Sequence, residues 1–197
     1  MRVLLVGATG TIGRAVGAAL SAVGHEVVGV SRSSSPLAVE LGDPASIRRL
    51  FERVGELDAV VCCAGQPRFG ALGELEEEDF AVSLGEKLMG QVNFVRRGFE
   101  RLRDGGSITL TAGTLPRRPK AGAALAALVN GALEGFVRSA ALDAPRGLRV
   151  NVVSPHWVSE TLVALGMDPA AGVPASELAA LYVRAVTGGA TGQVFEA

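Results

Sequence analysis

The stretch that decides the fold is Val3-Leu4-Leu5-Val6-Gly7-Ala8-Thr9-Gly10-Thr11-Ile12-Gly13, near the start of the 197-residue chain. Four consecutive apolar residues are typical of a strand that is buried on both faces. The glycines that follow have the spacing G-x-x-G-x-x-G, and the pattern of residues 11–23 predicts a helix directly after them. A strand, a glycine-rich turn and a helix in this order are typical of dinucleotide-binding domains.

Each glycine of this turn has its own physical reason. Gly7 permits the tight turn, and Gly10 lets the backbone approach a pyrophosphate. Gly13 lets the helix pack close to the sheet, so that the amino terminus of the helix faces the anion. The alternative is a glycine turn with a structural role only.

Short apolar runs alternate with longer helical patterns along the rest of the chain. Further strands are predicted at residues 26–31, 37–41, 58–63, 106–111, 148–153 and 192–195. Further helices are predicted at residues 43–55, 76–103 with a bend near Gly85 or Gly90, 121–143 and 174–186. Helical connections between buried strands imply a parallel sheet. The prediction is a three-layer, doubly wound Rossmann fold in a single domain over residues 1–197.

Charge and composition exclude several classes of protein. Nineteen basic against 20 acidic residues give a net charge of −1, which argues against a nucleic-acid surface or an anionic membrane as partner. No helix-turn-helix pattern and no apolar stretch of about 20 residues is present. The adjacent Cys62 and Cys63 favour neither a disulfide nor a zinc site. We therefore expect a cytoplasmic protein without a metal.

The end of the second strand selects the nucleotide, since an acid there binds a ribose 2′-hydroxyl and an arginine suits a 2′-phosphate. The sequence reads Val30-Ser31-Arg32-Ser33-Ser34-Ser35, without an acid. Arg32 supplies a bidentate cation and the serines supply hydroxyls. This pattern favours NADP(H) over NAD(H); the alternative for Arg32 is an ordinary surface residue.

Several motifs together resemble the short-chain dehydrogenase/reductase family over nearly the whole chain. Besides the glycine turn, they are Glu40-Leu41-Gly42-Asp43, Cys62-Cys63-Ala64-Gly65, Gly106-Ser107-Ile108, Gly131-Ala132-Leu133-Glu134-Gly135-Phe136 and the run from Gly147 to Pro155. The resemblance implies a homodimer or homotetramer and a nicotinamide cofactor. The implied cofactor-binding residues are Gly7, Thr9, Gly10, Thr11, Ile12, Gly13, Ser31, Arg32, Glu40, Leu41, Cys63, Ala64, Gly65, Pro155 and Val158.

The chain departs from the family where the chemistry takes place. The family uses a tyrosine that transfers a proton and a lysine four residues later, and these positions align with Ala126 and Asn130. The family serine aligns with Gly113, although Thr111 or Thr114 can supply a hydroxyl nearby. The only tyrosine, Tyr182, is interpreted as a packing residue.

Four residues are candidates for the catalytic group: Lys87, Thr111, Asn130 and His156. Lys87 aligns with the family's helix asparagine, and a desolvated lysine there is able to act as an acid. His156 replaces a glycine, and histidine transfers protons near neutral pH. For Lys87 the alternative is a surface lysine on a long helix or a lysine bound to nearby carbonyls, and for His156 it is a structural role. For Asn130 it is a hydrogen bond between helices rather than a ribose contact.

Two functions remain open at this point. The first is an NADP(H)-dependent oxidoreductase that acts on a carbonyl or alcohol through a replaced proton donor. The second is a non-catalytic sensor or scaffold that binds NADP(H) but has lost the chemical half of its site. The fold by itself does not decide between them.

Overall fold

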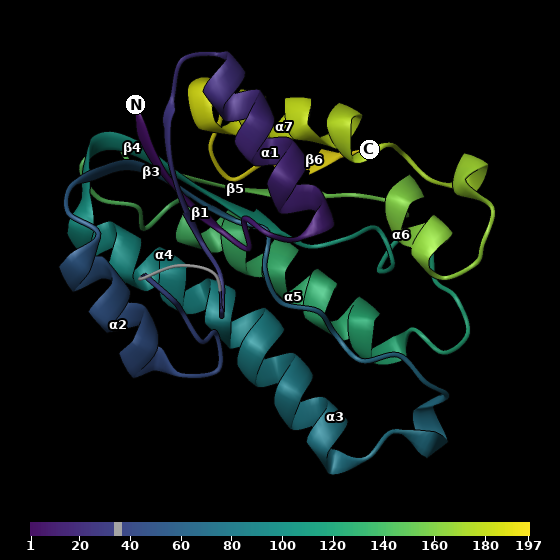
Figure 1. Cartoon of the computed structure of the whole chain (residues 1–197). Helices are drawn as coiled ribbons and strands as arrows, with labels where there is room; N and C mark the ends of the chain where they lie inside the picture. The colour runs from purple at the N-terminus through teal and green to yellow at the C-terminus, as the bar shows by residue number, and fades with distance from the viewer. Residues whose placement is uncertain (34–36) are drawn as a thin grey trace.

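The computed structural model describes residues 1–33 and 37–197, and a parallel sheet forms its centre (Figure 1). Six strands lie in the order β2-β1-β3-β4-β5-β6. Their bounds are β1 Arg2–Val6, β2 Glu26–Val30, β3 Leu57–Cys62, β4 Leu102–Thr111, β5 Arg149–Ser154 and β6 Val194–Glu196. All pairs between neighbouring strands are parallel, which confirms the predicted doubly wound Rossmann fold.

Helices cover both faces of this sheet and complete three layers, with α1 and α7 on one face and α2, α4 and α5 on the other (Figure 1). The helices are α1 Thr11–Ala22, α2 Pro44–Arg53, α3 Glu77–Val82, α4 Gly90–Arg101, α5 Ala124–Ala140, α6 Ser159–Ala164 and α7 Ala175–Thr187. Short 3₁₀ turns lie at Leu72–Glu74 and Pro169–Ala171. Within the described residues, no helix combines the length and the apolar character that a membrane crossing requires.

The first strand shows why an unbroken apolar run is needed. Val3 and Leu5 pack into the core beneath α1 and α7, whereas Leu4 and Val6 pack into the core beneath α2, α4 and α5. Successive side chains of a strand point to opposite faces, so both faces must be apolar when helices cover both.

The prediction of a strand at residues 37–41 is wrong. Residues 37–41 form turns and irregular backbone instead. Val39 and Leu41 are nevertheless buried in the core, and the Val39 N–H donates to the Ser31 carbonyl over 3.2 Å. The segment is therefore apolar because it packs on the core, without joining the sheet.

The predicted bend near Gly85 or Gly90 is a change of helix type. Between α3 and α4, the segment η2 (Ser83–Met89) is π-helical, and the Gly90 N–H donates to the Gly85 carbonyl five residues earlier. The wider turn changes the direction in which the following side chains point, and π-helical turns are frequent at functional sites. Lys87 lies within η2.

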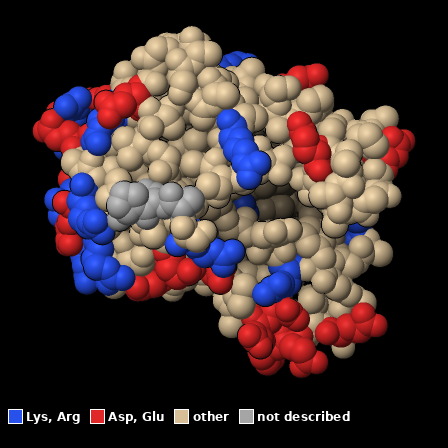
Figure 2. Space-filling model, in the orientation of Figure 1, with Lys and Arg blue, Asp and Glu red and all other residues tan. Residues whose placement is uncertain are grey.

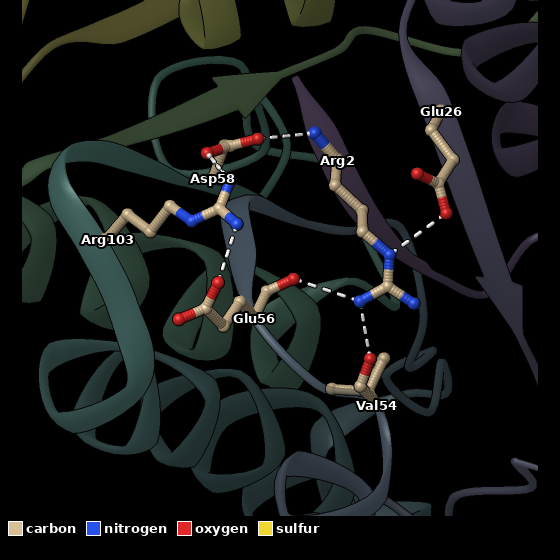
Figure 3. A network of polar contacts seen from close by, with 6 residues as sticks. All are labelled: Arg2, Glu26, Val54, Glu56, Asp58 and Arg103. Atoms are coloured by element: carbon tan, nitrogen blue, oxygen red, sulfur yellow. Dashed lines mark hydrogen bonds and ion pairs between the residues drawn. The ribbon is translucent and has the colours of Figure 1, made fainter.

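The amino ends of the strands carry a network of charged residues around Arg2 (Figure 3). The Arg2 guanidinium donates to Glu26 Oε1 over 2.9 Å and to the carbonyls of Val54 and Glu56 over 2.5 and 2.9 Å. The Arg2 N–H donates to Asp58 over 2.6 Å, and Arg103 donates to both Asp58 and Glu56. The network links β1, β2, β3 and β4 at one edge of the sheet.

Candidate functional site

A cleft of about 710 Å³ lies at the carboxyl ends of β1, β2 and β3, and Figure 2 shows the hollow with basic side chains at its edge. The strand order changes direction here, because β1 is followed in the chain by β2 on one side and then by β3 on the other. In open parallel sheets, ligands bind at such a switch point.

The glycine turn after β1 has the geometry that the spacing predicts. Gly7 has a φ of +85°, and a Cβ added there meets the backbone nitrogen of Ala64 at 3.0 Å. A Cβ at Gly13 meets the Gly7 carbonyl oxygen at 2.0 Å, so only glycine lets α1 begin this close to the turn. No larger residue fits at position 13 without displacing the backbone.

The amino terminus of α1 is suited to an anion. Gly10 is the N-cap, no side chain caps the helix, and no acid lies in its first turn. Thr9, Gly10, Thr11 and Ile12 line the cleft. Uncapped N–H groups and the positive end of the helix dipole are the usual elements of a phosphate site. The residues present therefore fit the pyrophosphate of a dinucleotide.

Most of the residues implied as cofactor contacts line this cleft. They are Gly7, Thr9, Gly10, Thr11, Ile12, Ser31, Arg32, Glu40, Leu41, Cys63, Ala64 and Gly65. Gly13 lies behind the turn, Val158 is buried in a small apolar cluster, and Pro155 lines a different pocket. Ser34 and Ser35 lie outside the described residues.

Arg32 follows β2 at the edge of the cleft. Its side chain is exposed, and it forms no ion pair with the residues that the structure describes. A guanidinium without a carboxylate partner remains available for a phosphate. Two acids, Glu40 and Glu86, also line the cleft.

A second, smaller pocket of about 180 Å³ adjoins the cleft, since Gln66 lines both. Loops after β3, β4 and β5 and the inward faces of η2 and α5 form it. Its lining residues are Gln66, Pro67, Phe69, Lys87, Ala112, Gly113, Thr114, Leu115, Asn130, Pro155, His156 and Trp157. The pocket thus joins three predicted catalytic candidates: Lys87, Asn130 and His156.

Lys87 lies between the two cavities. Its side chain is 4% exposed and passes over Gly65, where an added Cβ meets Lys87 Cα and Cδ at 3.0 and 3.1 Å. No hydrogen bond or ion pair joins its ammonium to another described residue. Burial lowers the pKa of Lys87 to about 8, so the group can both hold and release a proton near neutral pH.

The neighbouring thiols do not neutralise this charge. Burial raises the pKa of Cys62 to about 11 and that of Cys63 to about 12, so both are protonated at pH 7. A buried ammonium without a counter-ion is costly, which is the condition under which lysines become reactive.

Asn130 shows a second unsatisfied group. It is 5% exposed, and its Oδ1 is buried without a hydrogen-bond partner in the described residues. The alternative of a hydrogen bond between helices therefore has no support in the structure. A Cβ at Gly113 meets Asn130 Nδ2 at 2.8 Å, so the asparagine fills space that a serine at position 113 needs.

Thr114 and His156 form a pair in the wall of the pocket. Thr114 Oγ1 lies 3.0 Å from His156 Nδ1. Burial lowers the pKa of His156, and the nearby charges of Arg118 and Lys120 lower it further. The imidazole is therefore neutral at pH 7, and one of its nitrogens accepts a proton or a hydrogen bond.

Thr111 requires a correction. Its Oγ1 donates to the Cys62 carbonyl over 2.7 Å and lies 2.8 Å from the Tyr182 hydroxyl, on the side of the sheet covered by α7. The threonine hydroxyl of the pocket is that of Thr114, which lies in the loop that follows the end of β4 at Thr111. The buried Tyr182 belongs to the core.

Sequence reasoning missed Phe69 and Lys120. Phe69 lies beside Trp157 at the pocket, with ring centroids 6.3 Å apart, and Lys120 Nζ lies 5.0 Å from the centroid of the Trp157 ring. One signal was present, because Lys87 and Lys120 are the only lysines beside 17 arginines. Both lie at or beside this pocket, where an arginine would keep its proton permanently.

Comparisons with known proteins agree with the geometry. The family model described as enoyl-(acyl carrier protein) reductase matches residues 35–187. The 3-oxoacyl-[acyl-carrier-protein] reductase FabG of Escherichia coli (strain K12) is 30% identical over 195 residues, which cover 86% of this chain and 79% of that protein. L-xylulose reductase of Homo sapiens is 31% identical over 180 residues, covering 82% of this chain and 73% of that protein.

Two solved structures extend the similarity to three dimensions. The protein lin1944 of Listeria innocua has a TM-score of 0.94 at 38% identity, covering 100% of this chain and 98% of that one. A small-chain dehydrogenase solved in complex with NADPH has a TM-score of 0.88 at 26% identity, and the match covers 100% of this chain and 96% of that one. In sequence and in fold, the chain belongs to the short-chain dehydrogenase/reductase family.

Proposed function

We propose that the chain is an NADP(H)-dependent oxidoreductase that interconverts a carbonyl and an alcohol, with Lys87 as the proton donor. The observation that carries the proposal is the position of Lys87, buried between the cleft and the pocket without a counter-ion among the described residues. The structure solved with NADPH supports the choice of cofactor for a similar chain. The family relationship supports the reaction class.

The cofactor is held by the turn after β1 and by the loop after β2. The uncapped start of α1 receives the pyrophosphate, and Arg32 receives the 2′-phosphate of the adenosine ribose. The amide of Asn130, whose Oδ1 has no partner among the described residues, binds a ribose hydroxyl. When bound, the cofactor supplies the hydride.

Lys87 completes the reduction at the carbonyl oxygen. As the carbonyl carbon gains the hydride, the oxygen gains negative charge, and Lys87 Nζ–H donates its proton to that oxygen. The products are the alcohol, the oxidised cofactor and a neutral Lys87 amine, which then takes a proton from water. In the opposite direction, the neutral amine accepts the proton of the alcohol.

Thr114 and His156 orient the carbonyl. With Nδ1 of the neutral imidazole near Thr114 Oγ1, the hydroxyl or the opposite ring nitrogen is available to hydrogen-bond a ligand oxygen in the pocket. This pair takes the place of the family serine, for which Gly113 offers no side chain. We assign the pair a positioning role and assign proton transfer to Lys87.

The cofactor half of the proposal is tested by calorimetric titration with NADPH and NADH. We expect the wild type to bind NADPH more tightly than NADH. Arg32→Ala should lower the affinity for NADPH by about 10- to 100-fold and change the affinity for NADH little. Arg53→Ala, an exposed arginine at the far end of α2, is the matched control. Equal affinities for both nucleotides in the wild type contradict the assignment of Arg32.

The chemical half is tested by following NADPH absorbance at 340 nm with a panel of neutral and acidic aldehydes and ketones. Turnover that Lys87→Met abolishes supports the oxidoreductase. Tight NADPH binding without turnover on any carbonyl favours the second function, a non-catalytic sensor or scaffold. That outcome is motivated by Ala126 and Asn130, which replace the family's tyrosine and lysine.

Three further expectations belong to this proposal. They are a single functional domain over residues 1–197, a homodimer or homotetramer, and a cytoplasmic location. Light scattering at micromolar concentration tests the assembly directly, and a monomer contradicts it.

A further inference from the structure

The small pocket has an unusual balance of charge. Among its described lining residues, Lys87 is the only formally charged side chain at neutral pH, and none is an acid. The other polar groups are the amides of Gln66 and Asn130, the Thr114 hydroxyl and a neutral imidazole. A ligand that fills this pocket therefore meets positive potential and no carboxylate.

The mouth of the pocket adds a second cation. Lys120 Nζ lies 5.0 Å from the centroid of the Trp157 ring, and Trp157 lines the pocket. Both Arg117 and Arg118, earlier in the same loop, pair with carboxylates, Arg117 with Glu134 and Glu196 and Arg118 with Glu196 at 3.8 Å. Lys120 has no such partner in the described part of the chain.

The position of Lys120 is set by the fold. The Ala123 N–H donates to the Lys120 carbonyl over 3.2 Å, which closes a turn. The Gly70 N–H donates to the Gly122 carbonyl over 2.9 Å, so this turn is tied to the loop that carries Phe69. The two loops thus hold one cation and two aromatic rings together at the entrance.

We propose that the pocket takes a small carbonyl compound bearing a carboxylate, with the carboxylate against Lys120 and the apolar body against the paired rings of Phe69 and Trp157. The proposal rests on the proposed function, because it names the substrate class of the same site. A volume of about 180 Å³ limits the substrate to a small molecule. The carboxylate supplies the anionic partner that Lys120 lacks among the described residues, and the carbonyl oxygen is directed toward Lys87.

The test compares two probes of nearly the same shape, benzoylformate and 1-phenylpropane-1,2-dione, which carry a carboxylate and an acetyl group at the same position. Calorimetric titration of the NADP⁺-saturated protein measures their affinities without turnover. We expect benzoylformate to bind at least about tenfold more tightly than the dione, as a charge-assisted contact implies. The advantage shrinks as salt is raised, because Lys120 is exposed.

Variants at position 120 test whether Lys120 causes the preference for the probe with the carboxylate. Lys120→Met keeps an apolar stem over Trp157 and removes the charge, so benzoylformate falls to the affinity of the dione. Lys120→Arg retains most of the preference, and Arg53→Met at a distant site changes nothing. The quenching of Trp157, the single tryptophan, gives an independent binding signal after correction for probe absorbance.

The outcomes separate this inference from the function on which it rests. Equal binding of the two probes, tighter binding of the dione, a preference that survives in Lys120→Met, or no binding of either probe overturns the substrate class. Reduction of neutral carbonyls by NADPH in that case leaves the oxidoreductase function intact. Absence of NADPH-dependent turnover on every carbonyl overturns the function, even where the charge preference in binding is present.

Discussion

At the amino ends of the strands, Arg2 is held by Glu26, Glu56 and Val54, and Arg103 by Glu56 and Asp58 (Figure 3). At the carboxyl ends, Lys87 is 4% exposed and its ammonium has no partner among the described residues, and Asn130 Oδ1 is buried without one. The same sheet thus carries a network of paired charges at the amino ends of its strands and two unpartnered polar groups near the carboxyl ends.

The paired charges at the amino ends of the strands contribute to stability, whereas the unpartnered groups at the carboxyl ends do not. A paired guanidinium that also bonds two carbonyls fixes the ends of β1, β2 and β3 relative to each other. An unpaired buried ammonium destabilises the fold, so this end of the sheet is not arranged for stability alone. Perturbed, unpartnered groups in a cleft are the physical signature of a functional site.

The largest expected effect is on turnover at the carboxyl edge. Lys87→Met should lower the rate of NADPH-dependent reduction by about 10²–10⁴-fold, because the proton donor is lost, with a much smaller effect on NADPH affinity. In the wild type, reduction needs protonated Lys87 and should fall as pH rises through about 8. Oxidation of the alcohol needs the neutral amine and should rise over the same interval.

Lys87→Arg is the matched control, since arginine keeps the charge but does not release a proton at these pH values. Steady-state rates from pH 6 to 10 measure both directions. A wild-type profile without an inflection near pH 8, or a fully active Lys87→Met, removes Lys87 from the proton transfer.

The second-largest expected effect is on stability, and it tests whether the charge of Lys87 is costly in the folded protein. The same Lys87→Met variant should be more stable than the wild type by about 1–3 kcal/mol at pH 7, because it removes an uncompensated buried charge. The folded state holds the pKa of Lys87 at about 8, below the ordinary value of 10.5, so between these values the unfolded chain binds more protons. Wild-type stability therefore gains from this group as pH rises from about 8 to 10.5.

Urea unfolding of both proteins at pH 7 and pH 10 measures this prediction. The difference in free energy of unfolding between the variant and the wild type should be smaller at pH 10, because the wild-type lysine is then neutral in the folded state. A variant that is less stable than the wild type at pH 7 contradicts the account of Lys87 as an unpaired buried cation.

The smallest expected effect is on stability, when the charge network at the amino ends of the strands loses Arg2. Arg2→Met should lower the free energy of unfolding by about 1–2 kcal/mol, because the carbonyls of Val54 and Glu56 and the carboxylate of Glu26 lose a donor. NADPH binding and turnover should stay unchanged. Arg97→Met, which breaks an exposed i,i+3 pair with Glu100, is the control and should cost less than about 0.5 kcal/mol. A change in turnover in Arg2→Met contradicts the separation of the two edges.

The fold was predictable because its signals are local. Apolar runs of strand length, the G-x-x-G-x-x-G spacing and the helical patterns between them follow from the sequence alone, as does the position of the phosphate turn. The prediction of a strand at residues 37–41 failed because apolar residues that pack on a core without joining a sheet have the same sequence pattern as a short strand. The lining of the cleft was largely predictable because most of its residues follow directly after strands.

The sequence by itself determined the doubly wound sheet and the glycine turn. Only the tertiary structure decided which polar residues meet in the pocket. It placed the Thr111 hydroxyl beside Tyr182 and the Thr114 hydroxyl beside His156, because β4 ends at Thr111 and a loop follows, and it placed Lys87 in a π-helical turn. It also joined Lys120, Phe69 and Trp157, which lie far apart in the chain, because the loops after parallel strands gather at one edge of the sheet.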